Sequence, residues 1–281
     1  YAKSIGISDI GIAPVYRYEK LMEVLENTST PFTTGAQKRI DPCLLLDGAK
    51  SAIMCVFNYY YDNRPGNIAR YARGEDYHNV VGKKLQMLEK YILYLFPKAN
   101  TYKFSDSSPM CDRYMAYLAG LGVLGKNHML IHSKFGTYVV IGGILTTLSL
   151  KPDSPIPDGC IGCNSCLQAC PGGALRADGS FDAMLCASYI TQQKGELNQN
   201  QQNVLSKSGN VYGCDMCAVV CPHNKNPMES DIEEFTKDLV HELTYKKLEC
   251  KDKFNKDFGN RAFNWRGCDV LRRNLNILKP E

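Results

Sequence analysis

Eight of the thirteen cysteines lie between positions 160 and 221, and their spacing limits the possible folds more than any other feature of the chain. The first run contains Cys160, Cys163, Cys166 and Cys170, and Pro171 follows it. This C-x2-C-x2-C-x3-C-P order is typical of loops that bind iron–sulfur clusters, in which three thiolates hold one four-iron cluster and the fourth reaches another. The sequence therefore predicts a local fold built around clusters.

The second run, Cys214-x2-Cys217-x3-Cys221, is one cysteine short of the full pattern, and Cys186 between the runs can supply the missing ligand. If the runs exchange ligands as in two-cluster bacterial ferredoxins, each [4Fe–4S] cluster receives four thiolates. The first cluster is then assigned Cys160, Cys163, Cys166 and Cys221, and the second Cys170, Cys186, Cys214 and Cys217. Zinc is the alternative, because C-x2-C pairs also bind zinc, but the two C-x3-C-P endings favour clusters.

Length and composition agree with a folded redox protein. The 281 residues carry a net charge of +4 and are 44% hydrophobic, as expected for one large and one small domain. No run of about 18 apolar residues occurs, and the N-terminal segment lacks the pattern of an export signal. We therefore expect no membrane span and a cytoplasmic location, where cysteines are metal ligands more often than disulfides.

Hydrophobic patterning outside the cysteine runs predicts both strands and helices. The predicted elements are a strand at 51–61, a helix at 77–96, a helix at 108–119 and a strand or hairpin at 136–150. We predict an α+β chain of three parts: an N-terminal α/β domain with a central sheet (1–155), a ferredoxin-like two-cluster domain (156–228) and a helical C-terminal segment (229–281). The Pro-rich stretch 151–158 is the predicted linker.

Two short motifs suggest cofactor sites but lack the required context. Gly120, Gly122 and Gly125 match G-x-G-x-x-G, yet the segment before them is predicted to be helical, whereas a dinucleotide fingerprint follows a strand. Asp76 and His78 resemble the D-x-H-x-x-G motif of some cobalamin enzymes, but the glycine comes one residue late. We therefore predict neither a nicotinamide site nor a cobalt-ligating histidine, and expect His78 to line a pocket or to form a local hydrogen bond.

Several other segments, taken in order with the cysteines, resemble the epoxyqueuosine reductase family, whose members are cobalamin-dependent enzymes that complete the queuosine base of the tRNA anticodon. The matching segments are 39–42, 68–78, 106–109, 119–127, 186–191, 213–217 and 271–274. The resemblance covers almost the whole chain. Family members usually continue into a C-terminal helical-repeat module that helps to hold tRNA, so a chain that ends at Glu281 is expected to be a short form.

The resemblance implies a cobalamin in the N-terminal domain, which receives electrons from the two [4Fe–4S] clusters. It places Asp106 at the position of the proton donor, and burial beside an apolar corrin face should raise the pKa of this carboxyl group. It also places Lys194 towards tRNA. The implied cofactor contacts are Arg39, Asp106, Ser188, Cys214 and Asp215. The implied partners are tRNA and an external electron donor such as a flavodoxin or ferredoxin, and the protein is expected to be a monomer.

Three alternatives accompany this interpretation. Asp106 would only cap the helix predicted at 108–119 if it had no catalytic role. The chain would be another cobalamin reductase if it belonged with the reductive dehalogenases, although those enzymes usually carry an export signal. It would be a two-cluster electron carrier if it had no substrate, although a carrier does not need so large an N-terminal domain.

Overall fold

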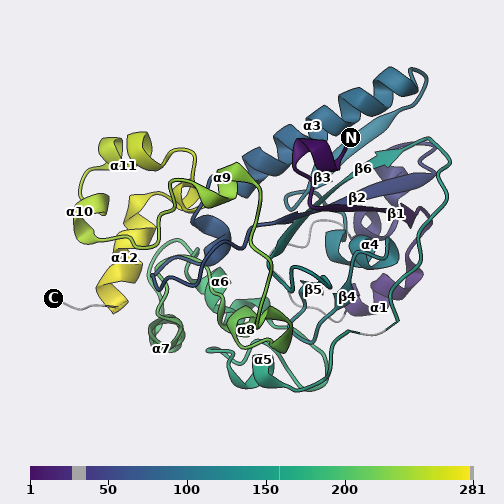
Figure 1. Cartoon of the computed structure of the whole chain (residues 1–281). Coiled ribbons are helices and arrows are strands. Elements are labelled where there is room, and N and C mark those ends of the chain that lie inside the picture. Colours follow the sequence, from purple (N-terminus) through teal and green to yellow (C-terminus); the bar gives the residue numbers. More distant parts are fainter. Residues whose placement is uncertain (27–35, 158, 279–281) are drawn as a thin grey trace.

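A four-stranded antiparallel sheet organises the N-terminal part of the chain (Figure 1). The computed structural model describes residues 1–26, 36–157 and 159–278. Across the sheet the strands are β1 (Asp9–Pro14), β2 (Ser51–Asn58), β6 (Val139–Thr146) and β3 (Thr101–Ser105), and every neighbouring pair is antiparallel. The predicted α+β class is confirmed. The strands predicted at 51–61 and 136–150 correspond to β2 and β6, each shorter than expected.

Helices cover both faces of this sheet. On one face lies α3 (Tyr77–Leu95), which confirms the predicted helix, and on the other lies α4 (Asp112–Leu118), which begins later than predicted. The side chains of β2 alternate accordingly: Ile53 belongs to the core beneath α3, and Met54 belongs to the core beneath α4. Every residue of β2 is buried, because a strand between two helical layers has no solvent-facing side.

The remaining elements of this part are short. They are α1 (Glu19–Glu26), α2 (Ala36–Ile40), and the hairpin strands β4 (Val123–Leu124) and β5 (Leu130–Ile131). Within the ranges given above, no helix combines the length and the apolar character needed to cross a membrane.

Close packing of α3 on the sheet depends on Gly142 in β6. A Cβ atom at this position would lie 2.7 Å from Cγ1 of Val81 and 3.0 Å from Cδ1 of Leu85. Both distances are shorter than van der Waals contact, so a larger residue would push the helix away from the sheet.

The cysteine-rich part consists of loops and short helices, which lie below the sheet in Figure 1. The helices are α5 (Ser165–Gln168), α6 (Ala187–Ile190), α7 (Gln199–Ser208) and α8 (Met216–Val219). Contact between α5 and α8 brings the two cysteine runs side by side. The segment predicted as a linker forms no helix or strand over 151–157 and runs along β1, where Asp153 and Ile12 exchange two hydrogen bonds.

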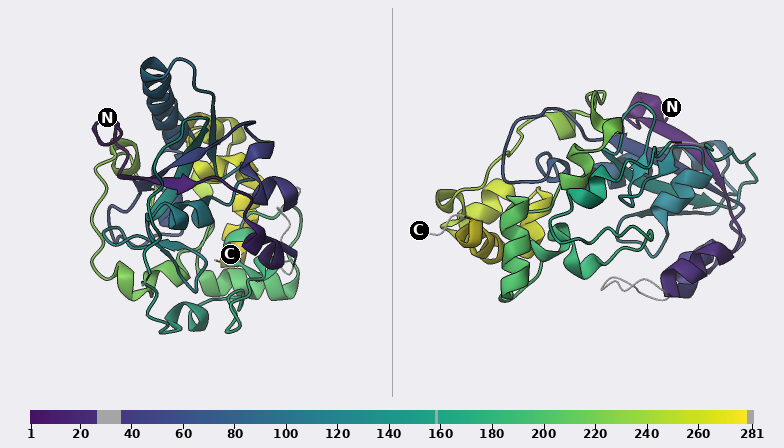
Figure 2. Two further views of the ribbon diagram at one scale, coloured as in Figure 1. Left: turned by 90° about the vertical axis from the view of Figure 1, so that its right-hand side faces the viewer. Right: turned by 90° about the horizontal axis from the view of Figure 1, so that it is seen from below.

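The C-terminal segment is helical, as its charged sequence predicted. Its helices are α9 (Glu233–Thr236), α10 (Tyr245–Leu248), α11 (Lys251–Phe258) and α12 (Cys268–Leu278). Phe254, Phe263 and Leu271 share one apolar core with Ile68 and Tyr212 from earlier in the chain. In Figures 1 and 2, α10, α11 and α12 lie at the end of the molecule opposite the sheet, whereas Phe235 of α9 belongs to the core between the sheet and α3. The domain boundaries at 155/156 and 228/229 remain predictions.

Asn224 joins the cysteine-rich part to the sheet domain. Its Oδ1 accepts a hydrogen bond from the backbone N of Thr137 at 2.8 Å, and its Nδ2 donates to Oγ1 of Thr137 and to the carbonyl O of Ala218, both at 2.7 Å. Asn224 is 8% exposed and Thr137 is 0% exposed, so water cannot replace these bonds when they are lost.

We expect Asn224→Ala to lower the free energy of unfolding by about 2–4 kcal/mol, because it leaves several buried polar groups without partners. Anaerobic urea unfolding followed by circular dichroism measures the change. Asn255→Ala, on the exposed side of α11, is the matched control and should change the free energy by less than about 0.5 kcal/mol. Equal effects of the two substitutions would contradict the role assigned to Asn224.

Candidate functional site

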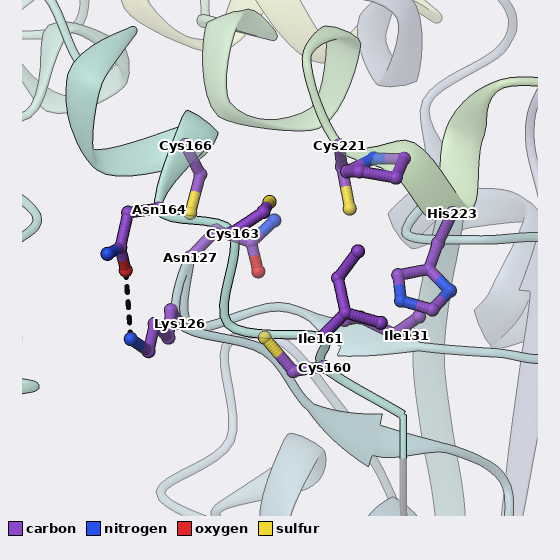
Figure 3. A pocket seen from close by; sticks show the side chains of 11 residues that line it. Lys126, Asn127, Ile131, Cys160, Ile161, Cys163, Asn164, Cys166, Cys221 and His223 are labelled. Atoms are coloured by element: carbon purple, nitrogen blue, oxygen red, sulfur yellow. Dashed lines mark hydrogen bonds between the residues drawn. The ribbon is translucent and has the colours of Figure 1, made fainter.

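Four cysteines from the two cysteine runs surround one pocket (Figure 3). Cys160 and Cys163 belong to the loop that leads into α5, Cys166 lies in α5, and Cys221 follows α8. Cys160 and Cys163 are exposed, whereas Cys166 and Cys221 are half-buried, so the pocket lies near the surface. These are the four residues predicted to hold the first cluster. Lys126, Asn127, Ile131, Asn164 and His223 also line the pocket.

The other four predicted ligands form a second group that lies deeper. Burial raises the pKa of Cys217, and the neighbouring charges of Cys214, Cys186 and Cys170 raise it further. Burial also raises the pKa of Cys214 to about 12. Free thiolates are therefore disfavoured here, and only a positively charged centre would keep these ligands deprotonated.

The two groups match the crossed ligation that the sequence predicts. Within the described ranges, no three potential ligands converge closely enough to hold a single metal ion. The assignment of each cysteine as a ligand remains a prediction.

Asp106 lies in the turn between β3 and α4, where hydrogen bonds hold both its side chain and its backbone. Its Oδ2 accepts a hydrogen bond from the hydroxyl of Tyr77 at 2.8 Å and lies 3.1 Å from Nε2 of His78. Its backbone N donates to Oδ2 of Asp112 at 2.9 Å. Its φ of +32° is a left-handed value that non-glycine residues seldom adopt. Asp106 does not cap α4, because Cys111 occupies the N-cap position.

Asp106 and His78 form a pair that carries a proton. The hydrogen bond from His78 lowers the pKa of Asp106, although partial burial opposes this change. Hydrogen bonds to Asp106 and Asp76 raise the pKa of His78 to about 9. At neutral pH the proton therefore resides on His78. In this structure the side chain of Asp106 is 59% exposed and paired with His78. The rise in its pKa was expected for burial beside a corrin face, and it remains a prediction.

Asp112 and Arg39 contact the Asp106 turn and the residues that link it to α4. Burial, together with the charge of Asp106, raises the pKa of Asp112 to about 7. Arg39, near the end of α2, forms a hydrogen bond with the thiol of Cys111. Arg39 therefore lies next to Cys111 at the start of α4. The Asp106 turn directly precedes this position in the chain.

Asp215 lies directly after Cys214 and is 8% exposed. Burial raises the pKa of this carboxyl group. Its Oδ2 accepts a hydrogen bond from the backbone N of Arg70 at 2.7 Å and lies 3.5 Å from Nη1 of the same residue. The Arg70–Asp215 ion pair thus borders the deeper cysteine group.

Ser188 reaches the Asp106 region through two tyrosines. It forms a hydrogen bond with the hydroxyl of Tyr71, and the ring centroids of Tyr71 and Tyr77 are 5.9 Å apart. Tyr77 in turn donates its hydroxyl hydrogen to Asp106. A layer of aromatic side chains therefore connects the predicted proton donor to the deeper cysteine group.

Lys194 lies away from this layer, exposed in the loop between α6 and α7. Arg273 anchors the loop, because its Nη1 donates a hydrogen bond to the carbonyl O of Gln193 at 2.8 Å.

Three residues that lie in the site were not predicted from the sequence, namely Arg70, Tyr71 and Tyr77. A signal for them existed, since all three fall with His78 in the matching segment 68–78. Of the two roles expected for His78, the local hydrogen bond is confirmed, because its Nδ1 lies 2.7 Å from Oδ1 of Asp76.

The glycine-rich segment does not have the context of a dinucleotide site, as predicted. It follows α4 and leads into the hairpin of β4 and β5, whereas a fingerprint needs a strand before it and a helix after it. Its last glycine, Gly125, is instead followed by Lys126 and Asn127, which line the pocket of the first cysteine group.

Comparison with known proteins reveals two matching family models. Residues 39–107 match the model described as "Epoxyqueuosine reductase QueG, DUF1730", and residues 159–224 match the "4Fe-4S double cluster binding domain". The epoxyqueuosine reductase of Bacillus cereus is 35% identical to this chain, over 98% of this chain and 77% of the relative.

Solved structures agree with the sequence matches. Selenomethionine-labelled epoxyqueuosine reductase superposes with a TM-score of 0.91 at 31% identity, over 99% of this chain and 79% of that chain. An epoxyqueuosine reductase with an epoxyqueuosine-modified tRNA-Tyr stem loop gives a TM-score of 0.89 at 31% identity, over 99% of this chain and 78% of that chain. A reductive dehalogenase, at 16% identity and a TM-score of 0.50, shares only the fold. The chain, which includes a 4Fe-4S double cluster domain, therefore belongs to the epoxyqueuosine reductase family of oxidoreductases.

Proposed function

We propose that this chain reduces epoxyqueuosine to queuosine in tRNA. The observation that carries the proposal is the His78–Asp106 pair, which bears a proton and lies across a layer of tyrosines from the buried cysteine group. Conversion of an epoxide to an alkene breaks two C–O bonds and consumes two electrons and two protons as the oxygen leaves as water. A site for this reaction must therefore supply electrons and protons to one place.

Cobalamin is the cofactor proposed for this site, and the residues there fit such a group. Nε of Arg70 is buried and has no hydrogen-bond partner in the part of the chain that the structure describes, so it is a donor available to a polar ligand. Bound cobalamin supplies low-valent cobalt, which delivers electrons to the substrate. The residues proposed to contact it are Arg39, Arg70, Asp106, Ser188, Cys214 and Asp215.

The difference in depth between the two cysteine groups suggests the direction of electron flow. The first group includes the exposed Cys160 and Cys163, so a cluster there is accessible to an external donor such as a flavodoxin or ferredoxin. The second group adjoins Asp215 and therefore lies nearer to the proposed cofactor. Electrons would enter at the first cluster and leave from the second.

Asp106 is proposed to hand the proton to the leaving oxygen, and His78 to supply it. Asp106 is the more exposed of the two, with 59% of its side chain accessible compared with 41% for His78. His78 holds the proton at neutral pH, because its pKa is raised to about 9. Proton transfer along their hydrogen bond therefore provides Asp106 with a proton that it would not retain alone.

The substrate base is proposed to arrive as part of tRNA. Lys194 is exposed on an anchored loop, where its charge is free to meet a phosphate group. We also propose that the protein is cytoplasmic and monomeric.

Asp106→Asn should lower the rate of epoxyqueuosine reduction by about 100-fold or more, because the amide cannot pass on a proton. The measurement is single-turnover reduction of an epoxyqueuosine-containing anticodon stem-loop with supplied cobalamin and a strong reductant. Asp178→Asn, in an exposed turn, is the matched control and should retain the parental rate. An Asp106→Asn variant that turns over at the parental rate would remove Asp106 from the mechanism.

The rate should fall as pH rises through about 9, because the pKa of His78 is raised above its usual value near 6.5 and the pair loses its proton only there. A pH series of single-turnover rates tests this expectation. His78→Gln should abolish this limb of the profile. A fall centred near pH 6.5, or a profile unchanged in the variant, would show that His78 does not hold the transferred proton.

Cys186→Ser should reduce the iron content of the anaerobically reconstituted protein from about eight to about four atoms per chain, because Cys186 is the predicted fourth ligand of the second cluster. Chemical iron analysis with electron paramagnetic resonance measures the loss. Cys250→Ser, at an exposed cysteine that belongs to neither cysteine group, is the control and should retain all the iron. Full iron content in Cys186→Ser would refute the assignment of Cys186 as a ligand of the second cluster.

A further inference from the structure

Two buried nitrogen atoms at the pocket of the first cysteine group have no hydrogen-bond partner among the residues that the structure describes. They are Nδ2 of Asn127 and Nε2 of His223. Both residues line the pocket with Cys160, Cys163, Cys166 and Cys221. Figure 3 shows the carboxamide of Asn127 near the space between the thiols and the imidazole of His223 beside it. Buried donors without acceptors are rare in folded proteins and call for an explanation.

The orientation of Asn127 is set by its own turn. Its Oδ1 accepts a hydrogen bond from the backbone N of Met129 at 3.2 Å, so the amide oxygen is already used and the N–H groups remain available. Asn127 itself is 6% exposed. Gly125 makes room for this arrangement, because a Cβ atom there would lie 2.5 Å from Oδ1 of Asn127. The last glycine of the glycine-rich segment therefore leaves the space that the Asn127 side chain occupies.

His223 is fixed by its place in the chain. It follows Cys221 and Pro222, and its backbone N–H forms a hydrogen bond with the thiol of Cys221. The sulfur atoms of a cluster and of its thiolates accept hydrogen bonds but do not donate them, so they would favour the tautomer with hydrogen on Nε2.

We propose that Asn127 and His223 donate N–H hydrogen bonds to the sulfur atoms of the first cluster and raise its reduction potential. The proposal rests on the cluster binding included in the proposed function, but not on the identity of the substrate. A reduced cluster carries one more negative charge than an oxidised cluster, so N–H donors stabilise the reduced form more strongly. The two residues thus ease electron entry at the exposed end of the chain of cofactors.

Removal of either donor should make the first cluster harder to reduce. A hydrogen bond to a charged acceptor changes an equilibrium by about tenfold, which is about 59 mV for a one-electron couple. Asn127→Leu and His223→Phe remove the donors while approximately preserving side-chain size. Ile131→Val, in the same pocket, changes volume without removing a donor and is the matched control.

The experiment is a potentiometric titration of each anaerobically reconstituted protein, followed by electron paramagnetic resonance, with iron analysis of the same samples. Both donor variants should shift the same one of the two reduction steps by about 59 mV to lower potential, and the control should shift neither step. Unshifted potentials in iron-replete variants, or shifts in different steps, would overturn the proposal. If one variant fails to assemble its clusters, the other carries the test. A parent protein without two clusters would overturn the cluster assignment and this proposal with it, whereas absence of epoxyqueuosine turnover would affect neither.

Discussion

Each of the two cysteine groups contains a cysteine from the other run, so the position of each run depends on the other. Cys221 joins the three cysteines at the start of the first run, while Cys170 lies with Cys186, Cys214 and Cys217. Neither group of four is complete until α5 and α8 are in contact. The loops around them contain little regular structure, so their shape depends on this pairing and on buried polar links such as Asn224 to Thr137. Metal binding would therefore be coupled to the folding of the whole region.

The packing of α3 and α4 on the sheet positions the groups around Asp106. Both faces of β2 are covered, by α3 and by α4, and the turns that begin these two helices meet at Asp106. Tyr77 and His78 occupy the first turn of α3, and Asp112 begins α4. The same packing that buries the apolar strand thus fixes a proton-bearing pair. The two tyrosines Tyr71 and Tyr77 extend this arrangement to the edge of the buried cysteine group.

The two cysteine groups differ in environment, although their sequence patterns are similar. The first is open to solvent and has N–H donors at its wall, and the second is enclosed and disfavours free thiolates. Such differences tune reduction potentials, because burial disfavours added charge and hydrogen bonds favour it. A chain of cofactors that begins at a surface needs its first member to be reducible by an external partner. The donors at the first pocket suit that requirement.

The sequence by itself predicted the cysteine groups, the two central strands β2 and β6, the helices α3 and α4, and the family, because residue spacing and hydrophobic periodicity are local properties. It did not predict the outer strands β1 and β3. It also predicted a helix before the glycine-rich segment, which is not the context of a dinucleotide fingerprint. Only the tertiary structure decided the state of Asp106. A carboxyl group expected to be protonated by burial is instead paired with His78, 28 positions away in sequence, and the proton moves to the imidazole. The protonation state of a side chain depends on the groups that contact it in space, and neither residue spacing nor hydrophobic pattern specifies those contacts.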